Sequence, residues 1–395
     1  MKLSDTLLSN IPVAYASCRE YDVPLIRRQI TALFHTLNIG QNVFCGKVIL
    51  VKPNLVMAKK PELAATTHPA VLQALAEVLA EFAPKKIIIA DSAGGPYNLP
   101  ALQVLYRTCG LSPLDKLPLV ELNTDCGFSD VEMEDGQRLR HCHMINPAVQ
   151  ADVCINVCKL KTHGLTGLSC ATKNLFGLIP GVEKFEMHAT FPQIEDFSEM
   201  LVDISEYMRT HTEYIALCDG IMGMEGNGPT HGTPVSSGLL LASRSPYALD
   251  VVAEHIIGCE NAAIHLDAAA ARGLVSRNWQ DIPLLFCEDT AEMASYSFRK
   301  PASSSGKFLK NLSGIMGGRL AEAFAARPAI RASGCVGCGV CVQSCPVHTI
   351  SLEKKKQKKI AVIHPEKCIR CYCCQELCPK GAVVLRKNPL IRWIH

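Results

Sequence analysis

Short apolar runs alternate with longer amphipathic stretches over roughly the first 290 residues of the chain. Runs rich in Ile, Val and Leu predict buried strands at 47–52, 86–91, 152–157, 214–219, 238–243 and 283–288. Apolar residues at helical spacing predict helices between them, at 69–83, 99–109, 193–210 and 246–257. Such alternation is typical of an α/β fold, with a parallel or mostly parallel sheet flanked by helices.

The pattern changes near residue 300. A Ser/Gly-rich stretch at 301–307 precedes a segment, 307–327, that predicts one amphipathic connecting helix. Two β-rich arms around a lysine tip then predict a hairpin at 349–368. We expect an α/β domain at 1–300, a linker at 301–331, a small α+β module at 332–386 and a tail at 387–395.

Polar groups follow four of the predicted strands, at 52–54, 91–96, 159–181 and 219–229. In a parallel sheet the carboxyl ends of the strands share one edge, and ligands bind there. We therefore expect these four segments to form loops that open on one edge. The densest is 159–181, where lysines stand among glycines, threonines and a histidine.

This glycine- and lysine-rich segment predicts an anion site. Glycines let backbone amides approach a ligand, and lysines supply positive charge for a carboxylate or a phosphate. It contains neither a P-loop motif nor a dinucleotide-binding G-x-G-x-x-G. The alternative is a long surface loop whose lysines are solvated.

The residues expected at this site fall into two groups. Those expected to be catalytic are Lys161, His163, Lys173 and Asp219. Those expected to bind the ligand or a cofactor are Lys52, Asn54, Asp91, Ser92, Gly94, Lys159, Gly164, Asn174, Gly181 and Glu225. The carboxylates among them also suit a divalent metal or, as turn formers, a purely structural role. His68, His163 and His188 are candidate bases or ligands, or ordinary polar residues with local partners.

Several motifs in this region resemble one known family. They are K-P-N-L at 52–55, D-S-A-G at 91–94, K-L-K-T-H-G-L-T-G and K-N-L-F-G-L-I-P-G between 159 and 181, and D-G-I-M-G-M-E-G-N-G-P at 219–229. Together they are similar to the domain of unknown function family 362, over roughly residues 45 to 290. The resemblance implies an architecture, often with a C-terminal two-cluster ferredoxin module, and no secure reaction. Ser169-Cys170-Ala171 departs from the family's pattern.

Eight cysteines near the C-terminus form two iron–sulfur ligand runs of the form C-x2-C-x2-C-x3-C-P. They are Cys335, Cys338, Cys341 and Cys345, then Cys368, Cys371, Cys374 and Cys378. Three closely spaced cysteines hold one cluster, and the fourth reaches the other. We expect two 4Fe-4S clusters, one on Cys335, Cys338, Cys341 and Cys378, the other on Cys368, Cys371, Cys374 and Cys345. The pattern resembles a bacterial ferredoxin, whereas structural zinc prefers separated C-x2-C pairs. Cys373 is expected to be a spare thiol.

The hydropathy, cysteine content and charge of the chain indicate the kind of environment in which the protein works. No apolar run approaches the roughly 18 residues of a membrane span, and the N-terminus is not a convincing signal peptide, so we expect a cytoplasmic protein without a membrane span. Eleven further cysteines precede Cys335, and such a load of free thiols suits a reducing cytosol and an anaerobe. The net charge of +3 conceals a basic C-terminal part. From Arg331 onward the chain contains twelve Lys and Arg but three Glu.

Five lysines crowd the predicted hairpin tip: Lys354, Lys355, Lys356, Lys358 and Lys359. They are either a solvated tip that offsets the charge of ligated clusters or a docking patch for an acidic redox partner. No aromatic residue interleaves with them, which argues against nucleic acid as a partner.

The sequence favours an electron-transfer protein in which two clusters serve an α/β domain that binds an anionic ligand or partner. Two alternatives stay open. One is an enzyme that performs non-redox chemistry on a carboxylate or phosphate, with structural or sensing clusters. The other is an assembly factor that delivers electrons to another enzyme. Whether the chain is an oxidoreductase or only a carrier is not decided by the residues.

Overall fold

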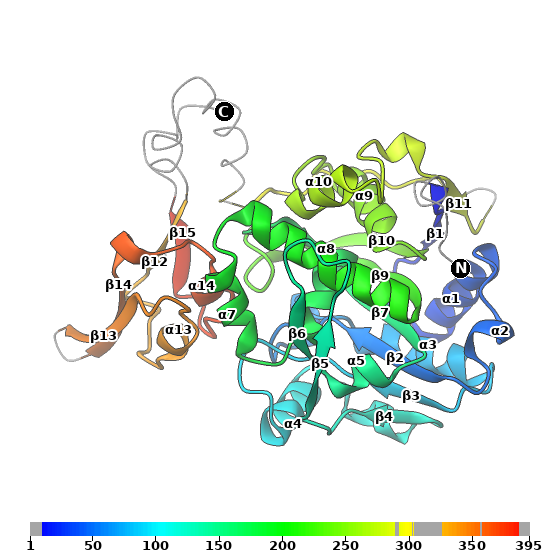
Figure 1. Cartoon of the computed structure of the whole chain (residues 1–395), viewed down its shortest axis with the longest axis horizontal. Coiled ribbons are helices and arrows are strands. Elements are labelled where there is room, and N and C mark those ends of the chain that lie inside the picture. The colour runs from blue at the N-terminus through cyan, green and yellow to red at the C-terminus, as the bar shows by residue number, and fades with distance from the viewer. Residues whose placement is uncertain (1–9, 289–291, 302, 304–325, 356–357, 387–395) are drawn as a thin grey trace.

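The structure is a computed structural model that describes residues 10–288, 292–301, 303, 326–355 and 358–386. Figure 1 shows a large part built around one sheet and a smaller part beside it that contains α13, α14 and β12 to β15. The helix predicted at 307–327 and the tail at 387–395 fall largely or wholly outside the described residues, as does Lys356.

The large part is organised by a nine-stranded sheet in the order β11-β1-β10-β9-β7-β2-β3-β4, with β8 paired to β7. Its strands are β1 (Val13–Ser17), β2 (Val48–Pro53), β3 (Lys86–Ile89), β4 (Val120–Leu122), β7 (Val153–His163), β8 (Gly167–Ser169), β9 (Glu213–Glu225), β10 (Thr233–Ser243) and β11 (Leu284–Phe286). The pairs β2–β3, β3–β4, β2–β7, β7–β9 and β1–β11 are parallel. β10 runs antiparallel to β1 and β9. The predicted mostly parallel sheet is confirmed.

Helices cover both faces of this sheet. One face is packed by α1 (Val23–Thr36), α2 (Gln41–Phe44), α3 (Pro69–Ala80) and α4 (Leu99–Thr108). The other is packed by α5 (Asn146–Gln150), α8 (Ile194–His211), α9 (Pro246–Ile256) and α10 (Ile264–Ala271). Their apolar stripes bury Ile26, Leu33 and Val71 on the first face and Leu201, Val252 and Leu266 on the second. This arrangement is the predicted α/β class.

Two short helices and a separate hairpin complete this part. α6 (Ala171–Asn174) and α7 (Glu183–Thr190) follow β8, and β5 (Phe128–Glu132) pairs with β6 (His141–Ile145). Single 3-10 turns lie at Pro61–Leu63, Ser112–Lys116, Leu175–Leu178 and Trp279–Asp281. The four predicted helices correspond to α3, α4, α8 and α9, whereas β1, β4 and the β5–β6 hairpin had no counterpart in the predicted elements.

The prediction that 159–163 and 219–225 are loops was wrong. β7 continues to His163 because its end pairs with β8, with Lys161 opposite Ser169. β9 continues to Glu225 because β10 pairs with it as far as Thr233. The registers of β7 and β9 shift between Lys159 and Lys161, so these two lysines meet different surroundings.

The smaller part is held by two antiparallel strand pairs. β12 (Arg327–Ile330) pairs with β15 (Val383–Arg386), and β13 (Ile350–Lys355) pairs with β14 (Lys358–Ile363) as the predicted hairpin. The helices α13 (Val340–Gln343) and α14 (Cys373–Glu376) and a 3-10 turn at Pro365–Lys367 lie between them. Because β12 falls within the predicted linker yet pairs with β15, this module begins before the expected boundary at 332.

Among the helices that the structure describes, none is both long and apolar enough to cross a membrane.

Candidate functional site

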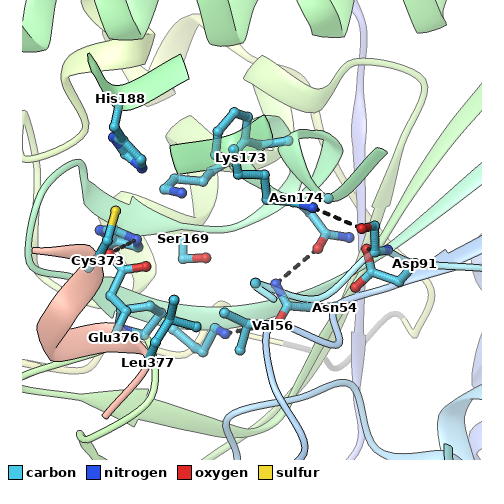
Figure 2. A pocket seen from close by; sticks show the side chains of 18 of the residues that line it. Asn54, Val56, Asp91, Ser169, Lys173, Asn174, His188, Cys373, Glu376 and Leu377 are labelled. Atoms are coloured by element: carbon cyan, nitrogen blue, oxygen red, sulfur yellow. Dashed lines mark hydrogen bonds and ion pairs between the residues drawn. The ribbon is translucent and has the colours of Figure 1, made fainter. Parts of the chain in front are cut away.

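A cavity lies where the α/β domain meets α14 of the small module, and it encloses about 650 Å³, part of it open to solvent. Nine of the residues predicted for the site line it: Lys52, Asn54, Asp91, Ser92, Gly94, Lys161, His163, Lys173 and Asn174. The small module contributes Cys373, Glu376 and Leu377. Figure 2 shows Lys173 and His188 across the cavity from Glu376 and Leu377. We call this cavity the interdomain pocket.

Lys52 and Asp91 form a buried ion pair in the wall of the interdomain pocket. The Nζ atom of Lys52 donates to Oδ1 of Asp91 at 2.8 Å, to the carbonyl oxygen of Pro53 at 2.8 Å and to Oδ1 of Asn174 at 3.3 Å. Asp91 also accepts hydrogen bonds from the backbone amides of Leu55 and Ser92. The three donors of Lys52 are therefore all used, and this pair is a fixed part of the wall.

Two glycines permit close approach at this site. A Cβ atom at Gly177 would lie 2.2 Å from Oδ1 of Asp91 and 2.6 Å from Nζ of Lys52. One at Gly94 would lie 2.7 Å from a methyl group of Leu377, so glycine at 94 lets the α/β domain contact the small module directly. Both close approaches depend on the absence of a side chain.

Lys161 joins the wall through an amide network. Its Nζ atom donates to Oδ1 of Asn54 at 2.9 Å and to the carbonyl oxygen of Ala65 at 2.7 Å. Asn54 in turn donates to Oδ1 of Asn174 at 2.9 Å. Burial, reinforced by the charges of Lys159 and Lys173, lowers the pKa of Lys161 to about 7.

Lys184 is the fourth lysine of the pocket. Its Nζ atom donates to Oγ of Ser92 at 3.1 Å and to the carbonyl oxygen of Ile179. The backbone amide of Gly181 also donates to Oγ of Ser92, at 2.7 Å, so Gly181 fixes this serine from just outside the lining. Burial lowers the pKa of Lys184 to about 7 as well.

Lys173 differs from the other three lysines. Its Nζ atom lies over the ring of Phe176, 5.1 Å from the centroid, and 5.9 Å from that of Phe197. Among the residues that the structure describes, it has no hydrogen bond and no ion pair. Burial lowers its pKa. Lys173 is therefore the lysine whose donors remain available to a bound anion.

His163 offers one further donor. Its Nδ1 atom accepts hydrogen bonds from the backbone amides of Leu165 at 3.0 Å and Thr166 at 3.3 Å, which places the proton of the neutral ring on Nε2. Nε2 is buried and lies 3.4 Å from Oε1 of Glu376, and it has no hydrogen-bond partner among the residues that the structure describes. Burial lowers the pKa of His163 well below its usual value, and His188, stacked on Phe197, has its pKa lowered to about 3 by burial.

Gly181, described above, and four other predicted site residues do not line the pocket. Lys159 and Asp219 form a buried ion pair at 2.8 Å, and the Tyr21 hydroxyl and the backbone amide of His68 also donate to Asp219. Glu225 pairs with Arg299 and accepts a hydrogen bond from its backbone amide. These pairings give the three charged residues structural partners.

Gly164, the fourth, belongs to the backbone behind the pocket. Its amide donates to the carbonyl oxygen of Gly228 at 3.2 Å, and its own carbonyl oxygen accepts from Ser303.

Some residues of the pocket had no place in the predicted site. Ser169, Phe176 and Val56 line it from the α/β domain. Glu376 and Cys373 line it from α14, between cysteines of the second ligand run. A carboxylate inside a cysteine run was the available sequence signal for Glu376, but its position opposite Lys173 depends on how the two parts dock.

Docking of the small module is specified by direct contacts. The Thr230 hydroxyl donates to the carbonyl oxygen of Glu376 at 2.6 Å, and the Gln375 side-chain amide donates to the carbonyl oxygen of Asn227 at 3.3 Å. Both ends of these bonds flank the pocket, so α14 is held against the β9–β10 connection.

Two smaller cavities inside the module are lined by the eight cysteines. One, of about 360 Å³, is lined by Cys335, Cys338, Cys341 and Cys378. The other, of about 320 Å³, is lined by Cys345, Cys368, Cys371 and Cys374. Each combination is the one that the spacing of the two runs predicts, and four thiols around one space fit a 4Fe-4S cluster. We call these the first and the second cluster cavity.

Backbone amides support the sulfur atoms in both cavities. The amide of Ala361 donates to Sγ of Cys335 at 3.4 Å, that of Ala382 to Cys378 at 3.2 Å, and that of Thr349 to Cys345 at 3.3 Å. Such N–H···S bonds tune the potential of a bound cluster. Cys373 lines neither cluster cavity and faces the interdomain pocket instead.

Three other thiols meet in the core of the α/β domain. Sγ of Cys170 lies 3.5 Å from that of Cys158 and 3.7 Å from that of Cys218, and all three side chains are fully buried among apolar residues. Cysteine in such surroundings packs as a small apolar residue.

Two known domains match this chain. Residues 49–255 match the domain of unknown function DUF362, which is more than half of the chain. The chain belongs to the DUF362 family. In this DUF362 protein, residues 334–382 also match a 4Fe-4S dicluster domain, so it is an iron–sulfur protein.

Individual relatives of the DUF362 protein add little about its reaction. It is 31% identical over 270 residues to a thylakoid-associated protein of Synechocystis sp., a match that covers 66% of this chain and 78% of the relative. A Thermotoga maritima protein of known structure superposes with a TM-score of 0.36 at 11% identity, over 58% of this chain and 57% of that one. The lactate racemase apoprotein from Thermoanaerobacterium thermosaccharolyticum gives 0.38 at 14% identity, over 63% and 58%.

Proposed function

We propose that this protein is an electron-transfer protein that performs redox chemistry on a small anionic ligand held in the interdomain pocket. The observation that carries the proposal is the shared lining of that pocket. Its cationic wall comes from the α/β domain, and its opposite wall comes from the segment Cys373–Leu377, which lies between the cluster ligands Cys371 and Cys378. A ligand in the pocket would thus contact the module that binds the clusters.

The chain would hold two 4Fe-4S clusters. Cys335, Cys338, Cys341 and Cys378 are the proposed ligands in the first cluster cavity, and Cys345, Cys368, Cys371 and Cys374 in the second. When bound, such clusters accept and donate single electrons. The role of the protein is to enclose the sulfur atoms, all but that of Cys338 at least partly buried, and to donate backbone hydrogen bonds to those of Cys335, Cys345 and Cys378.

Charge is the reason to expect an anion in the pocket. Four lysines line it, whereas the acidic side chains in its lining are Asp91 and Glu376. Asp91 is already paired with Lys52. A bound carboxylate or phosphate would compensate the remaining positive charge, which is costly to bury alone.

The available donors indicate how the ligand is held. Within the described part of the chain the N–H groups of Lys173 have no hydrogen-bond partner, His163 presents Nε2–H, and the Ser169 hydroxyl lies on the same cavity. These three would bind the anionic group, and Phe176 would cover one side of it. Glu376, whose Oε1 atom lies 3.4 Å from Nε2 of His163, is the carboxyl group placed to exchange a proton with the ligand.

A redox titration under anaerobic conditions tests the proposal. The clusters are followed by electron paramagnetic resonance, with and without a panel that contains inorganic phosphate, acetate, malonate, pyruvate and citrate. We expect at least one compound to shift the midpoint potential or the signal of a cluster. We expect the Lys173→Met variant to show no such shift. If no anion binds, or if a tightly bound anion leaves both cluster signals and potentials unchanged, the proposal is wrong.

A further inference from the structure

The hairpin of β13 and β14 forms the end of the small module that lies away from the α/β domain, whereas α14 lies on the side that meets it (Figure 1). In this hairpin Leu352 pairs with Ala361, and Lys354 pairs with Lys359. Because side chains alternate along a strand, these four residues share one face.

This face of the hairpin covers the first cluster cavity. Leu352 and Ala361 line the cavity together with Cys338. A Cβ atom at Gly337 would lie 3.2 Å from Cβ of Lys359, so Lys359 stands beside the loop that leads to Cys338. Lys359 therefore lies beside Gly337, a lining residue of the first cluster cavity, and Lys354 lies opposite Lys359 on the hairpin.

The first cluster cavity also reaches the surface here. Cys338 is exposed, as are the apolar side chains of Val336 (52%) and Leu352 (39%). The second cluster cavity has no exposed cysteine: Cys345 and Cys374 are buried, and Cys368 and Cys371 are half-buried. A patch of exposed apolar residues around one cluster ligand, bordered by charge, has the anatomy of a protein interface.

The charges of this patch are left unpaired. Lys354, Lys358 and Lys359 are exposed, and their side chains have no ion pair or hydrogen bond to any part of the chain that the structure describes. Like charges directly across a strand pair destabilise it, as for Lys354 opposite Lys359. Lys380 adds a further exposed cation to the lining of the same cavity. An unpaired cluster of this kind is complementary to an acidic surface.

We propose that the face formed by Val336, Cys338, Leu352, Lys354 and Lys359 is the docking site for an acidic one-electron redox protein. This inference rests on the proposed function, since it supplies the route by which electrons reach or leave the protein. Cys335, Cys338, Cys341 and Cys378 would hold the 4Fe-4S cluster nearest this face, and that cluster would accept one electron from the reduced partner, which would thereby be oxidised. The outer face then exchanges electrons with a protein, and the inner face, at α14, meets the small ligand.

The test uses the full-length cluster-loaded protein and a reduced, acidic two-cluster ferredoxin as the probe. The variant is Lys354→Glu/Lys359→Glu, and the matched control is Lys85→Glu/Lys116→Glu, which reverses two exposed lysines of the α/β domain. Stopped-flow absorption gives the rate of cluster reduction, and calorimetry with oxidised ferredoxin gives the affinity. Iron content and reduction by dithionite report whether the clusters are intact.

The proposal expects the hairpin variant to be reduced by the ferredoxin at least about tenfold more slowly at low salt and to bind it correspondingly more weakly. Rising ionic strength should slow the reduction of the unmodified protein by the ferredoxin and change the reduction rate of the variant little. Reduction by dithionite, and any effect of a pocket anion on the clusters, should be the same in all three proteins. This last result tests the docking site independently of the pocket, because either proposal can be wrong while the other one holds.

Three results would overturn the docking site. The first is equal reduction rates and affinities in the hairpin variant and the unmodified protein. The second is an equal loss in the control variant, which would show a general charge effect. The third is an absence of ferredoxin binding combined with lysine-dependent binding to vesicles containing 30% phosphatidylserine, which would assign the patch to an anionic membrane surface.

Discussion

The cluster cavities and the interdomain pocket of this DUF362 protein are built in opposite ways. The cluster cavities are lined almost wholly by thiols and apolar residues that lie within 55 residues of one another, from Pro328 to Val383. The interdomain pocket collects charged and polar groups from segments as far apart as Lys52 and Leu377. In the first case the ligand set is local, and in the second the whole fold is needed to assemble it.

This difference has an energetic side. A bound cluster would tie together the four cysteine sulfur atoms that surround it, so removal of one ligand should lower the stability of the module. In the pocket most charges already have protein partners, whereas Lys173 and Nε2 of His163 donate to no residue that the structure describes. Changes there should alter ligand binding while the clusters stay in place.

The largest effect is expected from loss of a cluster ligand. Cys374→Ser removes a thiol from the second cluster cavity, and we expect about half of the iron and sulfide to be lost and the module to unfold more readily. Chemical analysis of iron and sulfide checks this. The matched control is Cys373→Ser, which changes the adjacent thiol that faces the pocket and should leave the metal content unaltered. Equal losses in both variants would contradict the assignment of ligands.

The second-largest effect is expected from a methyl group at position 177, which should disturb the pocket wall. In Gly177→Ala the new Cβ would collide with Asp91 and Lys52, and overpacking of this kind costs about 1–3 kcal/mol. We expect a lower unfolding temperature and loss of anion binding, with normal iron content. Gly40→Ala is the comparison, since a Cβ atom there meets no atom within 4 Å and the backbone of Gly40 is not in the left-handed region. A fully stable Gly177→Ala protein that binds anions normally would show that the Lys52–Asp91 pair does not shape the pocket.

Lys173→Met should act on ligand binding alone. It removes the free ammonium group and keeps a side chain that can lie over Phe176, so we expect an anion's affinity to fall by about 10- to 100-fold, or about 1.4–2.8 kcal/mol. Calorimetry under anaerobic conditions measures it. Lys159→Met is not a suitable control because Asp219 would lose its partner, whereas Lys116→Met changes an exposed lysine far from the lining. An unchanged affinity would mean that Lys173 does not contact the ligand.

A smaller and graded effect is expected from pH. The pKa values of Lys161 and Lys184 are lowered to about 7, so both lysines lose their protons as the pH rises through neutrality. An anion binds the protonated form more tightly, and affinity should therefore fall above about pH 7, by up to about tenfold per pH unit for each lysine that must regain its proton. Affinity measured between pH 6 and 9 checks the sign. A rise in affinity over this range would contradict the cationic wall.

Much of the fold was predictable because apolar periodicity reflects local burial. The predicted strand at 86–91 and the predicted helix at 99–109 correspond to β3 and α4. The grouping of the cysteines around two cavities was predictable for a related reason, since the spacing of cysteines is a local property of the chain. The family was likewise recognisable from motifs, and the match to DUF362 confirms it.

The rest depended on long-range contacts. Lys159 and Lys173 belong to the same lysine-rich segment, yet Lys159 is paired with Asp219 and Lys173 lies free over Phe176. Nothing in their spacing distinguishes the two, because Asp219 is 60 residues away. The part played by Glu376 depends on the docking of α14 against the β9–β10 connection. The extension of β7 through Lys161 was missed because lysines and glycines weaken the signal of a strand.

One measurement tests the connection between pocket and clusters most directly. The protein is prepared in its fully reduced and fully oxidised forms, freed of excess reagent, and mixed anaerobically with an anion that it binds, while cluster absorption and the chemical identity of the anion are followed. We predict that one of the two forms changes its oxidation state as it converts the anion. The Lys173→Met variant should neither change its oxidation state nor convert the anion. An anion that binds with unchanged clusters and is recovered unaltered from both forms would contradict it.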